Sequence, residues 1–177
     1  MQHADAKFAD GLYGLNATRV REVISFDVAT GIFRWIKPNS QRTPVGSVAG
    51  GKRVTGYIAI SIDGHRYQAH RLAWLYVNGK WPSLEIDHIN GLRSDNRIAN
   101  LREASRSENQ QNRKTPSSRK LRHSAFMGVS MDKRDGIYFA QIKTNGKTKN
   151  LGRFIAQEDA HVAYLKAKRE IHPFNTI

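Results

Sequence analysis

Residues 84–112 read LEIDHINGLRSDNRIANLREASRSENQQN, and they predict a short series of structural elements. Residues 84–89 are apolar at both ends, which predicts a short strand, and Asn90-Gly91 is a strong signal for a turn after it. Residues 100–102 begin a returning strand, and 105–112 predict a helix. A strand, a loop, a second strand and a helix form a compact scaffold that can direct side chains toward one point.

Asp87, His88 and Asn109 are the side chains of this stretch with the most useful chemistry. A hard divalent cation prefers oxygen ligands, and Asp87 offers a carboxylate while Asn109 offers an amide carbonyl. Successive residues of a strand point to opposite faces, so Asp87 and His88 need not both bind a metal. Imidazole titrates near neutral pH, so His88 can take a proton from water as a general base. The pattern favours phosphodiester hydrolysis assisted by one divalent metal ion, with Mg²⁺ first and Mn²⁺ as the alternative.

Neighbouring side chains have less specific interpretations. Asn112 lies one helical turn from Asn109, so the two could exchange as a ligand. Glu108 is chemically the better cation ligand, but with Ser105 it fits a capping box at the start of the helix. His70 could approach the site, although a structural histidine at the junction of a strand and a helix is the preferred interpretation.

The composition indicates a polyanionic partner. Lys and Arg number 29 against 15 Asp and Glu in 177 residues, which gives a net charge of +14 and a pI near 10.4. Such a surplus favours a nucleic acid, above all double-stranded DNA. The chain has no run of the roughly 20 apolar residues that a membrane span needs, and its polar N-terminus lacks a signal peptide's apolar core. The absence of cysteine excludes disulfides, thiolate catalysis and cysteine zinc sites. We therefore expect a soluble, cytoplasmic protein.

The whole chain predicts an α+β protein in several parts. Residues 1–14 are expected to form a flexible leader, and 15–112 the domain that contains the motif, with its core at about 70–112. Residues 113–125 are basic and are either a flexible linker or a segment that becomes ordered on DNA. Residues 126–177 predict a second domain of three strands and one helix.

The region before the motif predicts a helix and a β-hairpin. Asn16 is a suitable N-cap, and the apolar residues after it keep a helical spacing through Ile24. Residues 32–36 predict a short strand. Alternation over 57–69, interrupted by Asp63-Gly64, predicts a hairpin with a two-residue turn, and a helix is expected from His70 onward.

Residues 70–112 resemble the HNH endonucleases, and more narrowly the phage-type HNH homing endonucleases. The resemblance is carried by His-Arg-Leu-Ala-Trp, Ile-Asp-His-Ile-Asn-Gly, Asp-Asn-Arg, Asn-Leu-Arg and Ser-Glu-Asn-Gln-Gln-Asn. It implies a ββα-metal fold in which His88 is the general base and Asp87 is a metal ligand. It also implies that Asn100 braces the loop and orients the base, and that Asn109 takes the place of the last histidine of the motif as a metal ligand, as in homing enzymes of this type.

Residues 128–170 resemble the AP2 DNA-binding domain. The matching segments are Gly-Val at 128–129, Ala-Gln-Ile-Lys at 140–143, Leu-Gly-Arg-Phe at 151–154 and the Glu-Asp-Ala helix that follows. That family lays a three-stranded sheet in the DNA major groove, where alternate side chains of each strand face the bases. The residues that the resemblance places against DNA are Ser130, Lys133, Arg134, Gln141, Lys143, Thr148, Asn150 and Arg153.

The sequence therefore favours a DNA endonuclease with a C-terminal targeting module. One alternative is a non-catalytic DNA-binding protein or regulator with a degenerate HNH fold, and another is a basic RNA-associated protein. The sheet lacks the aromatic stacking pair of common RNA readers, which counts against the latter. The recognition sequence, nicking against double-strand cleavage, and monomer against homodimer stay open at this point.

Overall fold

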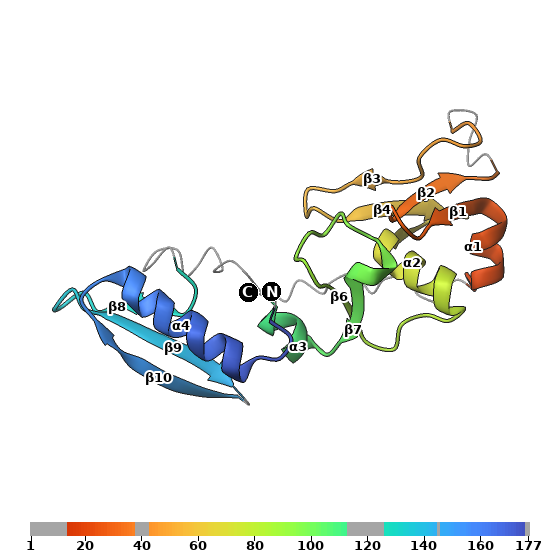
Figure 1. The fold of residues 1–177 in the computed structure, drawn as a ribbon. Coiled ribbons are helices and arrows are strands. Elements are labelled where there is room, and N and C mark those ends of the chain that lie inside the picture. Colours follow the sequence, from red (N-terminus) through yellow and green to blue (C-terminus); the bar gives the residue numbers. More distant parts are fainter. Residues whose placement is uncertain (1–13, 38–42, 113–125, 145, 176–177) are drawn as a thin grey trace. The chain divides into compact units, whose positions relative to one another are not determined.

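The computed structural model describes residues 14–37, 43–112, 126–144 and 146–175 (Figure 1). The chain divides into two compact units, Met1–Ser105 and Arg106–Ile177, and each unit is described here by itself. The expected leader lies outside the described residues apart from Gly14, and so does the expected linker at 113–125. The division between the units falls between residues 105 and 106, whereas the sequence predicts a boundary after residue 112.

The first unit begins with helix α1 (Ala17–Val23), and Asn16 caps it as predicted. The Asn16 side-chain oxygen accepts a hydrogen bond from the backbone N–H of Arg19 at 2.9 Å. The prediction that the helix continues through Ile24 is wrong, because Ile24 begins strand β1 (Ile24–Asp27). Apolar and polar residues alternate over β1 with a period of two, and its hairpin with β2 (Ile32–Trp35) buries the apolar side.

A second sheet and a helix complete the core of the first unit. Strands β3 (Gly51–Lys52), β4 (Ile58–Ile62) and β5 (His65–Gln68) lie in that order in an antiparallel sheet. The predicted turn is confirmed, because Asp63 and Gly64 both have positive φ, 50° and 79°. Helix α2 (Ala69–Asn78) follows directly and packs its apolar face into the core formed by the sheets and α1.

The stretch that carries the motif folds in the predicted order. Strand β6 (Glu85–His88), the short helix η1 (Ile98–Asn100) and strand β7 (Leu101–Ala104) follow one another, and β6 pairs with β7 in antiparallel register. Helix α3 (Arg106–Gln111) comes next in the chain and belongs to the second unit. The sequence signals for strand, turn, strand and helix are therefore confirmed as local structure.

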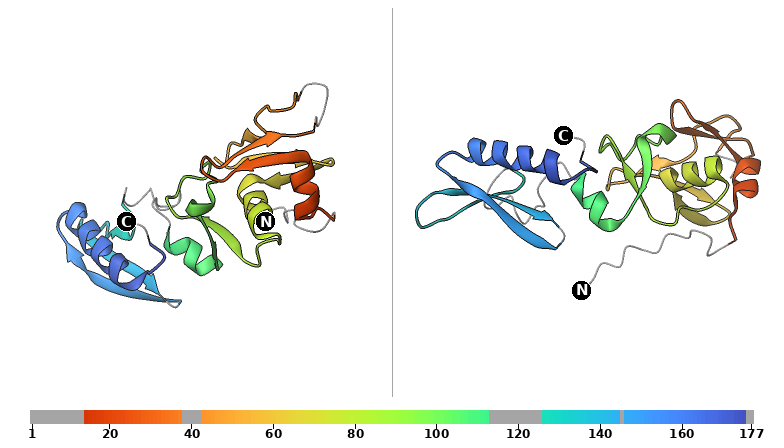
Figure 2. Two further views of the ribbon diagram at one scale, coloured as in Figure 1. Left: turned by 45° about the vertical axis from the view of Figure 1, so that its right-hand side comes forward. Right: turned by 60° about the horizontal axis from the view of Figure 1, so that its bottom comes forward.

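The second unit contains the predicted three-stranded antiparallel sheet packed against a helix. Strands β8 (Val129–Met131), β9 (Tyr138–Thr144) and β10 (Lys147–Phe154) lie in the order β10–β9–β8. Helix α4 (Gln157–Ile171) covers one face of this sheet (Figures 1 and 2). The φ of Gly128 is +72°, and a Cβ there would lie 1.9 Å from the ring of Tyr164, so the chain enters β8 tightly against α4. Among the described residues, no helix is both long and apolar enough to cross a membrane.

Candidate active site

Strand β6 holds Asp87 and His88, and both side chains are buried. Their residues are 5% and 4% exposed, although both are polar. The strand places them on opposite faces, and its pairing with β7 sets Asp87 opposite Arg102 and His88 opposite Leu101. A buried polar side chain carries a large desolvation cost unless it has partners, so the surroundings of these two residues decide what they can do.

Arg102 is the partner of Asp87. Its Nε and Nη2 both donate hydrogen bonds to the Oδ2 atom of Asp87, at 3.0 and 2.8 Å. The cross-strand register brings the guanidinium to this position. The attraction between the guanidinium and the carboxylate offsets part of the cost of burying the Asp87 side chain.

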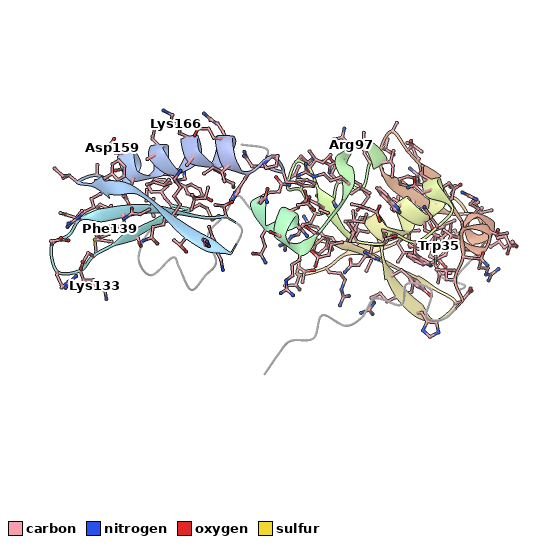
Figure 3. The ribbon with its side chains drawn as sticks, turned by 90° about the horizontal axis from the view of Figure 1, so that it is seen from below. Trp35, Arg97, Lys133, Phe139, Asp159 and Lys166 are labelled. Carbon is pink, nitrogen blue, oxygen red and sulfur yellow. The ribbon has the colours of Figure 1, made fainter. Side chains whose placement is uncertain are left out.

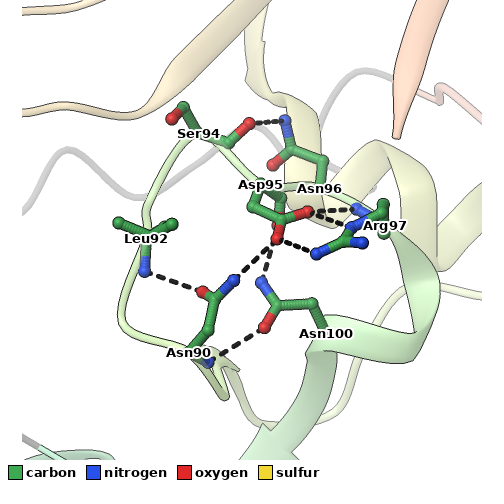
Figure 4. A network of polar contacts seen from close by, with 7 residues as sticks. All are labelled: Asn90, Leu92, Ser94, Asp95, Asn96, Arg97 and Asn100. Carbon is green, nitrogen blue, oxygen red and sulfur yellow. Dashed lines mark hydrogen bonds and ion pairs between the residues drawn. The ribbon is translucent and has the colours of Figure 1, made fainter. Parts of the chain in front are cut away.

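Asn100 joins the two ends of the loop that follows β6 (Figure 4). Its Oδ1 accepts a hydrogen bond from the backbone N–H of Asn90 at 2.9 Å, and its Nδ2 donates to the carbonyl oxygen of Asp95 at 2.9 Å. The Asn90 Nδ2 also donates to the Asp95 carboxylate at 2.7 Å. Arg97 adds two short contacts to that carboxylate and holds the pKa of Asp95 at about 2. A single buried amide therefore fixes the path of the loop next to His88.

Burial is the largest influence on His88 and lowers its pKa. The Asn96 side chain acts in the opposite direction, as do the nearby carboxylates of Asp87 and Asp95, while the charge of Arg93 adds to the lowering. The net shift keeps the imidazole neutral at physiological pH. A neutral imidazole is the form that accepts a proton, so the environment suits a general base.

A second histidine lies against His88. His70 lies near the start of α2. The centroid of its ring is 5.0 Å from that of the His88 ring, and the two rings are almost perpendicular. Tyr57 lies beside both imidazoles. The centroid of its ring is 5.2 Å from that of His70 and 5.8 Å from that of His88. His70 is 7% exposed, and burial, with the charges of His88 and Arg71 adding to it, lowers the pKa of His70 to about 3. His70 is therefore an uncharged side chain that packs against His88 at physiological pH.

Asn109 lies on α3, which belongs to the second unit. Asn109 is half-buried and Asn112, the alternative ligand, is 5% exposed. Within the described part of the chain, no group of three His, Asp or Glu side chains could hold a metal ion. The buried, cation-paired carboxylate of Asp87 fits a hard ion such as Mg²⁺, which takes one or two carboxylates and completes its shell with water and phosphate oxygens.

Most of the residues that are expected to contact DNA lie on the open face of the second unit's sheet. Directly paired residues share a face, and the register pairs Gln141 with Asn150 and Lys143 with Thr148. Ala140 and Ile142, which alternate with them, are buried under α4. Figure 3 shows Phe139 on the sheet and Lys166 on the helix. The expected contact residues that share this open face by register are Ser130, Gln141, Lys143, Thr148, Asn150 and Arg153.

Two of the expected DNA-binding cations are ion-paired in this structure. Arg134 bonds to Asp132 at 2.9 Å, and Arg153 bonds to Asp135 at 2.6 Å while its guanidinium stacks on Phe139. These pairs are largely exposed, and exposed pairs contribute little, so a phosphate can replace the carboxylate at small cost. Lys133 lies in the same loop and is exposed.

Three residues around His88 have no local signal in the sequence, namely Tyr57, Arg93 and Arg102. Their positions depend on strand pairing and on contacts between segments that are distant in the chain. The ring of His70, a residue that the sequence suggests could approach the site, contacts the ring of His88. The one signal that could have found Arg102 is the strand pairing, since the hairpin register sets it opposite Asp87.

Comparison with known proteins gives one match. The sequence model of the HNH endonuclease family matches residues 67–111, a segment that contains Asp87, His88, Asn100 and Asn109. The chain matches no curated protein and no solved structure. HNH endonucleases are phosphodiester hydrolases that act on DNA and generally use a divalent metal ion. The chain therefore carries an HNH endonuclease domain at residues 67–111.

Proposed function

We propose that the chain is a divalent-metal-dependent DNA endonuclease in which His88 is the general base. The observation that carries the proposal is the buried Asp87-His88 pair inside the HNH segment. His88 is held neutral by burial and lies beside a loop that Asn100 ties at both ends. These features support a fixed imidazole that can take a proton from the attacking water at the phosphate.

We propose Asp87 and Asn109 as the metal ligands. Asp87 accepts two hydrogen bonds from Arg102, and Asn109 stands at the last position of the motif within the matched segment. A divalent cation held by them would stabilise negative charge on the phosphate and on the leaving oxygen. Asn100 would act as a positioning residue, because it fixes the loop that packs beside the base.

We propose that the second unit is an AP2-like module that targets the nuclease to duplex DNA. Its open sheet face supports this, because six of the expected contact residues share that face and the helix covers the other. The resemblance of the motif to phage homing enzymes supports a homing role for the whole protein. The proposed targeting makes the affinity for DNA strongly dependent on salt, since each phosphate contact releases counterions.

A plasmid assay tests the nuclease activity. Supercoiled DNA is incubated with the full-length protein and Mg²⁺ or Mn²⁺, with EDTA as the control. Metal-dependent relaxation would show nicking, and linearisation would show double-strand cleavage. A protein that binds duplex DNA tightly but cuts none of a broad library of targets would contradict the proposal and favour a binding protein with an inactive HNH fold.

A further inference from the structure

Arg93 lies in the loop after β6, and two contacts with the segment between β3 and β4 hold its side chain. Its Nη1 donates a hydrogen bond to the carbonyl oxygen of Thr55 at 2.9 Å. Its Cζ lies 4.9 Å from the centroid of the Tyr57 ring, so the guanidinium stacks on that ring. The hydrogen bond holds one nitrogen of the guanidinium, and the Tyr57 ring holds one of its faces. The side chain has therefore lost most of its rotamer freedom, and its charge has a fixed position.

Tyr57 connects Arg93 to the general base. The Arg93 guanidinium stacks on the ring of Tyr57. The centroid of that ring lies 5.8 Å from the centroid of the His88 ring. Arg93 therefore stands one aromatic ring away from the group that takes the proton.

Arg93 differs from two other arginines of this stretch in its contacts. Two other arginines of the same stretch are each paired with a carboxylate, Arg97 with Asp95 and Arg102 with Asp87. Among the described residues, by contrast, no carboxylate forms an ion pair with Arg93, and its two contacts are with a neutral carbonyl and a neutral ring. Arg93 is also exposed, so an anion can reach it from solvent.

We propose that Arg93 is a substrate-binding residue that contacts a phosphate of the DNA strand on which His88 acts. The inference rests on the proposed function of the site. A guanidinium offers five N–H donors in a planar fork that matches two phosphate oxygens, and only Nη1 is engaged by Thr55. A fixed cation beside the scissile phosphate also stabilises the charge that develops there. Thr55 and Tyr57 lie outside the matched segment, so the upstream part of the first unit would help to build the site.

A salt series on DNA binding tests the contact without any cutting. The full-length protein is titrated into a fluorescent duplex in EDTA, and the affinity is followed by anisotropy from low to high salt. Arg93→Gln should lower the affinity and reduce the slope of log K against log salt by about one, the value for one lost phosphate contact. Arg93→Lys keeps the charge and should restore most of the slope.

Arg34→Gln is the matched control. It removes the same charge from the first unit, and the Arg34 guanidinium is likewise tied to a backbone carbonyl, that of Gly46 at 3.0 Å. This variant should keep the wild-type slope. An unchanged slope for Arg93→Gln, or an equal loss in both variants, would overturn the proposal, because the effect would then be absent or due to net charge alone.

Cleavage kinetics separate this inference from the proposed function. If the wild-type protein cuts plasmid, Arg93→Gln should slow cutting by about 10- to 100-fold at saturating protein, because a donor to the developing charge is lost. Arg93→Lys should recover part of that rate, and a full rate in Arg93→Gln would overturn the proposal. If the wild-type protein cuts no DNA, the proposed function fails, while the binding series still decides whether Arg93 contacts phosphate.

Discussion

The two hydrogen bonds from Arg102 to Asp87 end on one oxygen atom, Oδ2 of the carboxylate. The Asp87 side chain is 7% exposed and that of Arg102 is 25% exposed, so the pair lies mostly inside the protein. Because Arg102 lies directly opposite on the paired strand, the hairpin itself supplies the counter-charge. This explains how an acidic side chain can lie in the core of the first unit.

Removing Arg102 should destabilise the first unit. Arg102→Leu leaves a buried carboxylate without its cation, and we expect a loss of about 2 kcal/mol, less than the value for a fully buried pair because Arg102 is partly exposed. Adding Asp87→Asn should recover part of the loss, since removing both partners leaves no buried charge. Urea denaturation of both variants measures this, and equal losses in the two would contradict the account.

The stability of the first unit should fall as the pH is lowered through the range where histidine titrates. Burial lowers the pKa of His70 from its usual 6.5 to about 3. Between these values the unfolded chain binds a proton that the folded chain does not, so the free energy of unfolding falls from pH 6.5 toward pH 3. One proton contributes at most about 1.4 kcal/mol per pH unit, and above pH 6.5 the effect vanishes.

His70→Phe tests this pH dependence. The variant keeps a ring beside His88 and removes the group that cannot be protonated in the folded state. Denaturation curves between pH 7 and pH 4.5 should show a shallower fall in stability than the wild-type protein. Part of the fall should persist, because burial also lowers the pKa of His88. A slope identical to that of the wild type would mean that His70 is not buried in its neutral form.

Gly31 should be essential to the loop beside His88. It has a φ of +72°, and a Cβ there would lie 2.4 Å from the backbone nitrogen of Arg97 and 2.6 Å from the carbonyl carbon of Asn96. Gly46 has a similar φ, +81°, with nothing within 4 Å of an added Cβ. Both alanine variants carry the left-handed strain of about 1–2 kcal/mol, but Gly31→Ala adds about 1–3 kcal/mol of overpacking.

The comparison of the two glycine variants has a clear readout. Urea denaturation should show the larger loss for Gly31→Ala, and the NMR signals of His88 should move in that variant and stay in place in Gly46→Ala. Equal losses of stability in the two variants would show that the turn at Gly31 is not closely packed against the loop that contains Asn96.

The open sheet face of the second unit should bind DNA through Lys143. Lys143 is exposed on β9. Lys166, which is labelled in Figure 3, is exposed on α4, the helix that covers the other face. Lys143→Gln should reduce the salt slope of duplex binding by about one, and Lys166→Gln, which removes the same charge, should leave it unchanged. Equal effects of the two variants would indicate binding through net charge and not through this face.

Local signals predicted most of the fold. The Asn16 cap, the Asp63-Gly64 turn and the α4 helix are determined by neighbours within a few residues, and each appears where the sequence places it. The end of α1 was missed because Ile24 fits both a helical and a strand spacing. Its place in β1 is decided by pairing with Trp35, a contact across the hairpin.

The candidate site was predictable only where its residues are close in sequence. Asp87, His88 and Asn100 stand in one motif, and the strand and loop that hold them have local signals. Tyr57 and Arg93 come from segments that meet only when the β3–β4 region packs on the loop after β6. Gly31 reaches the same loop from the first hairpin. Contacts of this kind depend on the tertiary fold, and no spacing in the sequence encodes them.

The most direct test of the central claim is cleavage by the His88→Ala variant, with duplex binding measured on the same preparation. His65→Ala, a change at a partly exposed histidine of β5, is the control. We predict that His88→Ala loses metal-dependent cleavage and binds duplex DNA as tightly as the wild-type protein, while His65→Ala retains both activities. Wild-type cleavage rates in a folded His88→Ala protein would contradict the assignment of His88 as the general base.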